Sequence, residues 1–261
     1  MRMVVNMARP WRFLPGQHLY LYVPSVGWWT SHPFSSAWSE SEEVVTDDKG
    51  LPISYQDAAA SNKTTISLLV RRRNGFTNTL FKRAERAPNY SVTLNAFVEG
   101  PYGSLHSMDS YGTVVLFAGG VGISHQIPFV RRLVDGYAEG TVAARRVTLV
   151  WIIQSPEHLE WIRPWMTSIL NMNRRREVLR VQLFVTRPRN TKEIQSPSST
   201  VQMFPGRPNI NALVDMEIEN QVGSMGVLAC GSGGMCDDIR RVCRSRQYRS
   251  HIDFVEESFT W

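Results

Sequence analysis

Two glycine-rich turns in the second half of the chain contain the residue types that bind a phosphate group. One spans Gly119–Ser124 and follows the apolar run Thr113–Ala118. The other spans Cys230–Gly234 and follows the apolar run Met225–Cys230. Glycines allow backbone amides to approach a pyrophosphate, and the amino end of a following helix adds positive potential. Because parallel strands end at one edge of a sheet, the two turns predict a nucleotide site at that edge.

Each turn by itself is also explained by structure alone. Neither has the G-x-G-x-x-G spacing of the dinucleotide fingerprint, and Asp135 falls inside a helical pattern instead of at the strand end where a ribose-binding acid belongs. An isolated glycine turn after a strand is structural at least as often as functional. Cys230 at a strand end is equally consistent with a small core residue. The hypothesis of a nucleotide site therefore depends on the presence of both turns.

A third candidate, His32–Ser35 (HPFS), lies in the first half of the chain and combines aromatic rings, a rigid proline and a hydroxyl. Pro33 fixes the local backbone, so Phe34 and Ser35 can present a stacking surface and a hydrogen bond to one planar ligand. An edge-strand proline beside a core phenylalanine explains the same residues, and this structural explanation is favoured when the residues are considered alone.

The basic segment Arg71–Thr77 leaves a strand pattern and enters a helical one. Thr77 is predicted to be the N-cap of that helix. Arg71, at a strand end beside a helix amino terminus, is suited to hold a diphosphate. A solvated basic edge is the structural alternative.

The chain ends in two aromatic residues, Phe259 and Trp261. Chain ends are ordinarily frayed. We therefore expect these rings to dock, either on an apolar patch or on a flat ligand.

The secondary-structure patterns around these motifs differ between the two halves of the chain. The first half contains short β-rich runs separated by turn formers, which is typical of an antiparallel β-barrel or sandwich. These runs are Gln17–Val23, Thr65–Arg71 and Val92–Val98. Between them, the acidic and polar segment Ser39–Lys63 is predicted to be a surface insertion.

From Tyr111 onward, strand and helix patterns alternate, which predicts a parallel, Rossmann-like sheet covered by helices. The strand candidates are Thr113–Ala118, Arg146–Ile153, Val178–Val185, Met225–Cys230 and Ile252–Val255. The helix candidates are Ser124–Tyr137, Glu157–Met172, Ile210–Gln221 and Met235–Gln247. The polar segment Arg187–Pro208 is predicted to be a loop near the carboxyl edge of the sheet. We therefore predict two domains, residues 1–108 (β-barrel) and residues 109–261 (α/β).

Composition favours a folded, soluble, cytoplasmic protein. Hydrophobic residues make up 43% of the chain and charged residues 20%, which is near the globular average. No apolar run approaches the roughly 20 residues that span a bilayer, and no signal peptide is recognisable. Three cysteines lack the spacing of a metal site or a disulfide framework. The net charge of +6 favours anionic partners, but no nucleic-acid-binding motif surrounds the basic runs.

Eight short motifs follow one another along nearly the whole chain. They are PGQH (Pro15–His18), HPFS (His32–Ser35), the turn Arg71–Thr77, GPYG (Gly100–Gly103), GGVGIS (Gly119–Ser124), GRPN (Gly206–Asn209), CGSGG (Cys230–Gly234) and FVEESF (Phe254–Phe259). In this order they resemble the dehydrogenase module that fungal ferric-chelate reductases share with NADPH oxidases. That module is similar to ferredoxin-NADP reductase. The order, more than any single motif, carries the resemblance.

The resemblance implies an FAD-binding β-barrel domain and an NADPH-binding α/β domain. The residues that it places on FAD are His32, Pro33, Phe34 and Ser35 at the flavin ring, and Arg71, Gly75 and Thr77 at the pyrophosphate. Those that it places on NADPH are Gly119, Gly120, Gly122, Ile123, Ser124, Arg207, Cys230, Gly231 and Gly233, with Arg187 a weaker candidate. Ser35 near flavin N5, Cys230 beside the nicotinamide and Phe259 over the flavin are the implied catalytic residues. Trp261 extends past Phe259, so the identity of the covering aromatic stays open.

The resemblance further implies hydride transfer from NADPH to FAD, then single-electron transfer towards haem and an Fe(III) chelate. The implied acceptor is a transmembrane haem domain that this sequence does not contain, so a fragment of a longer protein is one expectation. Full-length relatives would carry the module at the cytosolic face of a membrane. Two alternatives stay open: a soluble flavin reductase or diaphorase, and a non-catalytic FAD-binding remnant. Neither a metal ligand set nor a nucleic-acid partner is expected.

Overall fold

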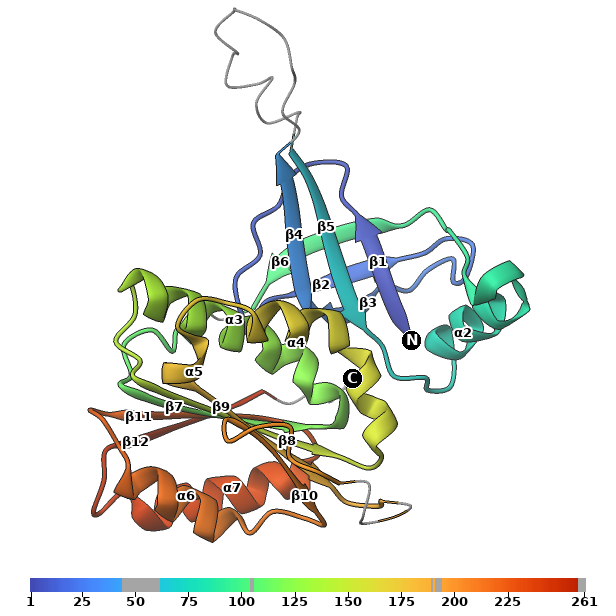
Figure 1. Cartoon of the computed structure of the whole chain (residues 1–261). Helices are drawn as coiled ribbons and strands as arrows, with labels where there is room; N and C mark the ends of the chain where they lie inside the picture. Colours follow the sequence, from blue (N-terminus) through green and yellow to red (C-terminus); the bar gives the residue numbers. More distant parts are fainter. Residues whose placement is uncertain (44–61, 104–105, 189, 191–193, 258–261) are drawn as a thin grey trace, which may run out of the picture. The chain divides into compact units, whose positions relative to one another are not determined.

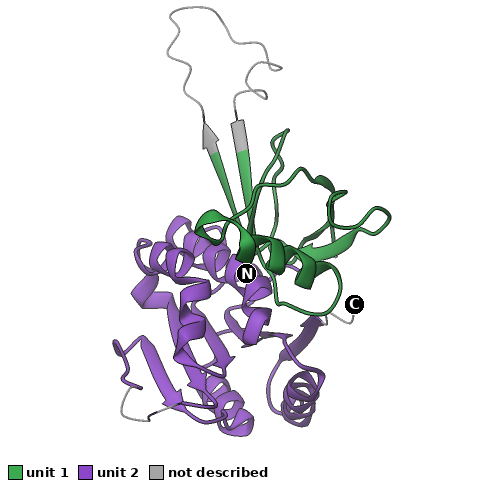
Figure 2. Cartoon of the chain, turned by 90° about the vertical axis from the view of Figure 1, so that its right-hand side faces the viewer, with its two compact units in different colours: residues 1–105 green, residues 106–261 purple. Residues whose placement is uncertain are grey.

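The computed structural model describes residues 1–43, 62–103, 106–188, 190 and 194–257 of the 261-residue chain. The chain divides into two compact units, Met1–Leu105 and His106–Trp261, which Figure 2 distinguishes by colour. Among the described residues, no helix has both the length and the apolar character needed to cross a membrane.

The described part of the first unit contains two three-stranded antiparallel sheets. One has the order β1-β5-β4, with β1 at Arg2–Asn6, β5 at Asn62–Leu69 and β4 at Trp38–Glu43. The other has the order β3-β2-β6, with β3 at His32–Ser35, β2 at His18–Tyr22 and β6 at Phe97–Tyr102. A helix, α2 (Phe76–Arg86), and a short 3-10 turn, η1 (Pro88–Tyr90), lie between β5 and β6.

Alternating apolar residues from both sheets form the core of the first unit. Leu19 and Leu21 of β2 are buried together with Ile66 and Leu68 of β5. Alternate residues of a strand point to the same face, so each strand contributes every second side chain to this core. The antiparallel β architecture predicted for the first half is confirmed.

Two details of that prediction were wrong. The segment Ser39–Lys63 is not an insertion throughout, because its ends belong to β4 and β5 and pair from Trp38↔Ser67 to Glu43↔Asn62. A ladder needs only backbone donors and acceptors, and a polar edge strand such as β4 gives no apolar signal. Residues 44–61 lie outside the described part. The strand expected at Val92–Val98 begins only at Phe97, where β2 supplies the partner Tyr22.

The second unit is a six-stranded parallel sheet with the order β10-β9-β8-β7-β11-β12. Its strands are β7 (Thr113–Gly119), β8 (Arg146–Ile153), β9 (Leu179–Val185), β10 (Val201–Pro205), β11 (Met225–Cys230) and β12 (Ile252–Glu257). Its helices are α3 (Ile123–Glu139), α4 (Arg163–Leu170), α5 (Arg175–Val178), α6 (Ile210–Glu219) and α7 (Gly233–Arg246), with 3-10 turns η2 (Gly120–Gly122) and η3 (Pro156–Trp161). Figure 1 shows α3, α4 and α5 over one face of the sheet and α6 and α7 over the other. The predicted parallel α/β fold is confirmed.

Two segments of this unit differ from the sequence-based expectation. The segment Arg187–Pro208, expected to be a loop, contains β10, which pairs with β9 from Val201↔Val181 to Pro205↔Val185. It is a short edge strand of 5 residues that ends in a proline and needs one backbone partner only, so the polar segment around it concealed it. The expected helix Glu157–Met172 is divided at Ile162 into η3 and α4. Pro164 lacks an amide hydrogen and is suited to the first turn of a new helix.

A buried ion pair fastens α6 to the sheet. Glu217, whose side chain is 1% exposed, accepts hydrogen bonds from Arg146 (Nε–Oε2 2.5 Å, Nη2–Oε1 3.0 Å) and from the Thr148 hydroxyl at 3.0 Å. Arg146 and Thr148 both belong to β8. The carboxylate is therefore compensated entirely by donors from one strand.

Glu217→Gln should lower the free energy of unfolding by about 3 kcal/mol, because removing one member of a buried pair leaves the other charge uncompensated. Urea unfolding followed by circular dichroism measures the loss. The control is Glu219→Gln, an exposed position on the same helix, which should change stability by less than about 0.5 kcal/mol. Equal effects of the two substitutions would contradict the structural role given to Glu217.

Candidate functional site

The two glycine turns predicted from the sequence lie against each other at the carboxyl edge of the parallel sheet. Strands β7 and β11 are neighbours and pair up to Ala118↔Cys230. A Cβ atom on Gly122 would overlap the carbonyl oxygen of Cys230, and one on Gly231 would lie 3.1 Å from the Cα atom of Gly119. Only glycine permits this approach of backbone to backbone.

The turn after β7 leaves its helix amino end open. Gly120 has a φ of +54°, and no atom lies within 4 Å of the position that its Cβ would take. The indole Nε1 of Trp151 donates to the Gly120 carbonyl at 2.9 Å and holds the turn. The Ser124 hydroxyl donates to the Val121 carbonyl and does not cap α3, which has no side-chain cap. An uncapped helix amino end behind a glycine turn is a ready anion site.

Ile123 and Ser124, also predicted to contact the nucleotide, have buried side chains that are 0% and 5% exposed. Neither side chain is open to a ligand, and the Ile123 amide already donates to the carbonyls of Gly120 and Val121. Two residues later, buried Gln126 donates to the carbonyls of Phe117 in β7 and Leu228 in β11, at 3.0 and 3.2 Å. Gln126 thus ties α3 to both strands that lead into the glycine turns, a role with no recognisable signal in the sequence.

Two arginines follow the neighbouring strands β9 and β10 at the same edge. Val185 pairs with Pro205, and Arg187 and Arg207 each come two residues later. The Gly206 amide donates to the Val185 carbonyl at 2.7 Å, which extends the pairing towards the arginines. Both arginines are exposed, and neither forms an ion pair with another described residue. They place two positive charges at the rim of the sheet.

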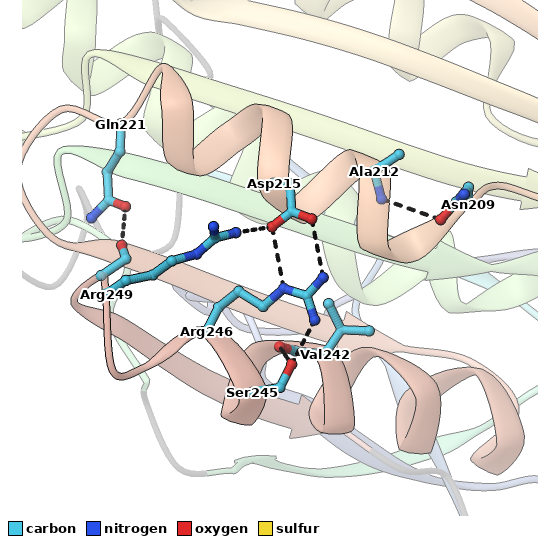
Figure 3. Close-up of polar contacts among 9 residues, drawn as sticks. Asn209, Ala212, Asp215, Gln221, Val242, Ser245, Arg246 and Arg249 are labelled. Atoms are coloured by element: carbon cyan, nitrogen blue, oxygen red, sulfur yellow. Dashed lines mark hydrogen bonds and ion pairs between the residues drawn. The ribbon is translucent and has the colours of Figure 1, made fainter.

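The start of α6 is fixed directly after Arg207. The Asn209 side chain accepts from the Ala212 amide at 3.2 Å and caps the helix (Figure 3). Asp215 of α6 binds Arg246 of α7 at 3.0 Å and also Arg249, as Figure 3 shows. The hydrogen bond from Arg246 lowers the pKa of Asp215, so this link stays ionised at neutral pH.

Cys230 and Glu257 lie side by side at the ends of β11 and β12. Cys230 is 0% exposed, and burial raises the pKa of its thiol, which therefore stays protonated. Glu257 is half-buried, and desolvation raises the pKa of its carboxyl. Cys230 was predicted as a site residue, whereas Glu257 was not, although the FVEESF motif contains it.

Met235, at the start of α7, occupies the space between the two glycine turns. Its sulfur would lie 3.2 Å from a Cβ on Gly119, and its methyl group would overlap one on Gly231. Gly233, by contrast, has no atom within 4 Å of its Cβ position. Met235 was not predicted as a site residue, because its position matters only through two turns that are distant in the chain.

In the first unit, Arg71, Gly75 and Thr77 lie together at the start of α2. Gly75, with φ +82°, is the N-cap residue, and the helix has no side-chain cap. The prediction that Thr77 caps the helix is wrong, because its hydroxyl accepts from the Arg73 amide at 2.9 Å and donates to the Arg73 carbonyl at 3.0 Å. Thr77 closes the turn and leaves the helix amides available.

The three consecutive arginines before α2 are not equivalent. Arg72 donates to the Asn78 side chain at 2.9 Å, and its guanidinium carbon lies 4.4 Å from the centre of the Phe81 ring. Arg71 is exposed and has no such side-chain partner among the described residues. Arg71 and the likewise exposed Arg73, which forms hydrogen bonds through its backbone only, are therefore the arginines available to an anion at the helix amino end.

The HPFS residues form β3, an edge strand of their sheet. The His32 ring stacks on Phe76 with centroids 4.2 Å apart, and Phe34 packs against the core, so the structural explanation of this motif accounts for Phe34. Alternation along the strand places Pro33 and Ser35 on the opposite face from His32 and Phe34. Burial lowers the pKa of His32 and keeps the ring neutral.

The residues present in the first unit fit an anionic, polar cofactor such as FAD. The Nε2 atom of His32 is buried without a hydrogen-bond partner among the described residues. Buried polar atoms ordinarily have a partner, so a ligand atom would satisfy this one. The uncapped start of α2 and the available Arg71 guanidinium would hold a diphosphate. Phe259 and Trp261, expected to cover the flavin, lie outside the described residues.

The chain thus combines an antiparallel β unit that begins with an FAD-binding domain match and a parallel sheet with paired glycine turns that matches an NAD-binding domain. The family model "Ferric reductase NAD binding domain" matches residues 111–244, and the model "FAD-binding domain" matches residues 1–49. The chain belongs to the ferric reductase family.

Relatives with curated names agree. The chain is 31% identical over 61% of its length to a probable cell surface ferric reductase, kap2, of Aspergillus oryzae, and 24% identical over 99% of its length to ferric/cupric reductase transmembrane component 2 of Saccharomyces cerevisiae. It covers 20% and 37% of these two proteins, so it spans well under half of their length.

Solved structures share the fold. The CS-b5R domains of human Ncb5or match with a TM-score of 0.61 and 17% identity, covering 97% of this chain and 64% of that one. The FAD/NAD binding domain of a Vibrio cholerae nitric oxide dioxygenase matches with a TM-score of 0.55 and 12% identity, covering 99% and 92%.

Gly122→Ala and Gly120→Ala should separate packing from binding in the first turn. The Gly122 substitution forces a methyl group onto the Cys230 carbonyl, so we expect a fall in thermal stability of several degrees. The Gly120 substitution has open space and costs only the strain of its positive φ, about 1 kcal/mol. Calorimetry measures both, and a larger loss for Gly120→Ala would contradict the packing described.

All three cysteines should resist alkylation in the native protein at pH 8. Each is buried, and burial raises the pKa of Cys230, of Cys236 and, to about 12, of Cys243. Because the thiolate is the reacting species, iodoacetamide should label none in the time that labels all three in urea. Mass spectrometry counts the adducts, and rapid labelling of the folded chain would show that a thiol is reachable.

Proposed function

We propose that this chain is the electron-input module of a ferric reductase, in which NADPH reduces FAD and the electrons leave singly towards haem and Fe(III). The single observation that carries the proposal is the contact of the two glycine turns at one sheet edge, beside the open amino end of α3. The family membership and the names of the relatives support the acceptor.

In the first unit, Arg71 and the backbone amides at the start of α2 would bind the FAD diphosphate. Gly75 allows the chain to enter the helix without a side chain above it, and Thr77 holds the turn. The motif residues His32, Pro33, Phe34 and Ser35 would border the flavin, with the Ser35 hydroxyl as hydrogen-bond partner near N5. When bound, FAD would supply the conversion between two-electron and one-electron transfer.

In the second unit, backbone amides of the first turn would bind the NADPH pyrophosphate, with Gly231 and Gly233 bordering the nicotinamide side. Arg207, supported by Arg187, would pair with the 2′-phosphate. Cys230 would border the nicotinamide as a small neutral thiol, because its raised pKa keeps it protonated. Phe259 or Trp261 would cover the flavin until the nicotinamide arrives.

We also propose which molecule accepts the electrons from the reduced flavin. A transmembrane haem domain, as the names of the relatives suggest, would receive electrons from this module at the cytosolic face of a membrane. A soluble flavin reductase that passes electrons to small acceptors is the alternative, and the reduction experiment below applies to both. The haem partner is tested by whether a membrane-embedded haem protein, mixed with the module and NADPH, is reduced.

The purified chain, supplied with FAD, should bind flavin and lose the flavin absorbance when NADPH is added without oxygen. Arg187→Ala/Arg207→Ala should weaken NADPH binding by about tenfold to a hundredfold and leave NADH unchanged, because charge-assisted hydrogen bonds contribute about 1.5–3 kcal/mol. Arg244→Ala, an exposed position on α7, is the control. A chain that takes up no FAD, or reduction equally fast with NADH and NADPH, would refute the corresponding part of the proposal.

A further inference from the structure

The loop between β2 and β3 carries two consecutive tryptophans that are almost fully exposed. Trp28 is 75% exposed and Trp29 is 94% exposed, and Trp29 is the most exposed large hydrophobic side chain that the structure describes. Tryptophan combines a large apolar body with one polar N–H group, and it is enriched where a protein meets the interface of a membrane. We call residues 23–31 the tryptophan loop.

The exposure is not a result of a loosely held segment. The amides of Val26 and Gly27 donate to the Val23 carbonyl at 2.9 and 3.1 Å, which closes a turn at the base of the loop. The Tyr22 hydroxyl donates to the Trp28 carbonyl at 2.6 Å. The backbone that carries the indoles is therefore fixed by hydrogen bonds while the indoles project outward.

A second aromatic residue extends the apolar surface at the base of the loop. The ring of Phe97, which is 67% exposed, stacks on Tyr22 with centroids 6.0 Å apart and an interplanar angle of 26°. Tyr22 thus connects the loop to β6 through its ring and to Trp28 through its hydroxyl.

Positive charge adjoins the tryptophan loop. Arg83 of α2 donates from Nη1 to the Ser25 hydroxyl at 3.1 Å and from Nη2 to the Ser25 carbonyl. The same end of α2 carries the exposed residues Lys82 and Arg86, with Glu85 as the only carboxylate of the helix. Cations beside projecting tryptophans are complementary to a surface of anionic lipid headgroups, to which each Lys or Arg near the surface adds attraction.

We propose that the tryptophan loop and the basic end of α2 form a contact site for an anionic lipid surface, with Trp28 and Trp29 entering the headgroup layer. A narrow loop that projects two indoles suits penetration of a soft layer, whereas a protein interface ordinarily presents a broad apolar centre with a polar rim. His32 follows Trp29 by three positions in the sequence. If the proposed function holds, this contact brings the HPFS strand near a membrane-bound acceptor.

Sedimentation with lipid vesicles tests the site in the FAD-loaded chain. Wild type should bind vesicles of phosphatidylcholine with phosphatidylserine more strongly than vesicles of phosphatidylcholine alone. Trp28→Ser/Trp29→Ser should reduce binding at least tenfold on both, because it removes the inserted apolar surface. Lys82→Ala/Arg86→Ala should reduce binding about twentyfold on the anionic vesicles only.

The matched control is Tyr248→Ser, which removes an 84% exposed aromatic from the other unit and should leave vesicle binding unchanged. Absence of wild-type binding to anionic vesicles, or wild-type binding by the tryptophan variant, overturns the proposal. Loss of FAD affinity in the tryptophan variant would assign the indoles to the cofactor instead. Flavin reduction by NADPH is measured on the same samples, so a failure of the proposed function is seen separately from a failure to bind lipid.

Discussion

At the carboxyl edge of the parallel sheet, the backbone of one glycine turn lies directly against the backbone of the other. A side chain on Gly122 would overlap the carbonyl of Cys230, and a Cβ atom on Gly231 would lie only 3.1 Å from the Cα atom of Gly119. This approach fixes where α3 and α7 begin, and so fixes the direction of the amides at both helix starts. The phosphate site that we propose at this edge therefore depends on that close packing more than on any charged side chain.

Charge is added around this packed centre. Arg187 and Arg207 follow β9 and β10, and Cys230 and Glu257 are the last residues of β11 and β12 on the opposite side of β7. The centre is thus neutral and consists of backbone, and the rim beside β10 is cationic. On the other side, burial raises the pKa of the Cys230 thiol and of the Glu257 carboxyl, which favours their protonated forms. Such a gradient is suited to a ligand with an anionic end and a neutral reactive ring.

The central strands were predictable because they are buried on both faces and read as continuous apolar runs, as β8 and β11 do. The edge strands β4 and β10 were not, because one backbone partner suffices for them. The sequence of β4 is polar, and β10 is a short run of 5 residues inside a polar segment. In the site, glycine and arginine motifs were visible in the sequence. Met235 and Gln126 were not, because each acts on two strand ends that only the folded sheet brings together.

The position of β10 has an evolutionary consequence. It is bonded to the sheet on one side only, and Arg207 follows it at the outermost rim, whereas the glycine turns follow the inner strands β7 and β11. On the function proposed above, substitutions at the rim would change which nucleotide is preferred while the inner turns keep their packing. A lineage could then exchange its electron donor without rebuilding the contact between the glycine turns.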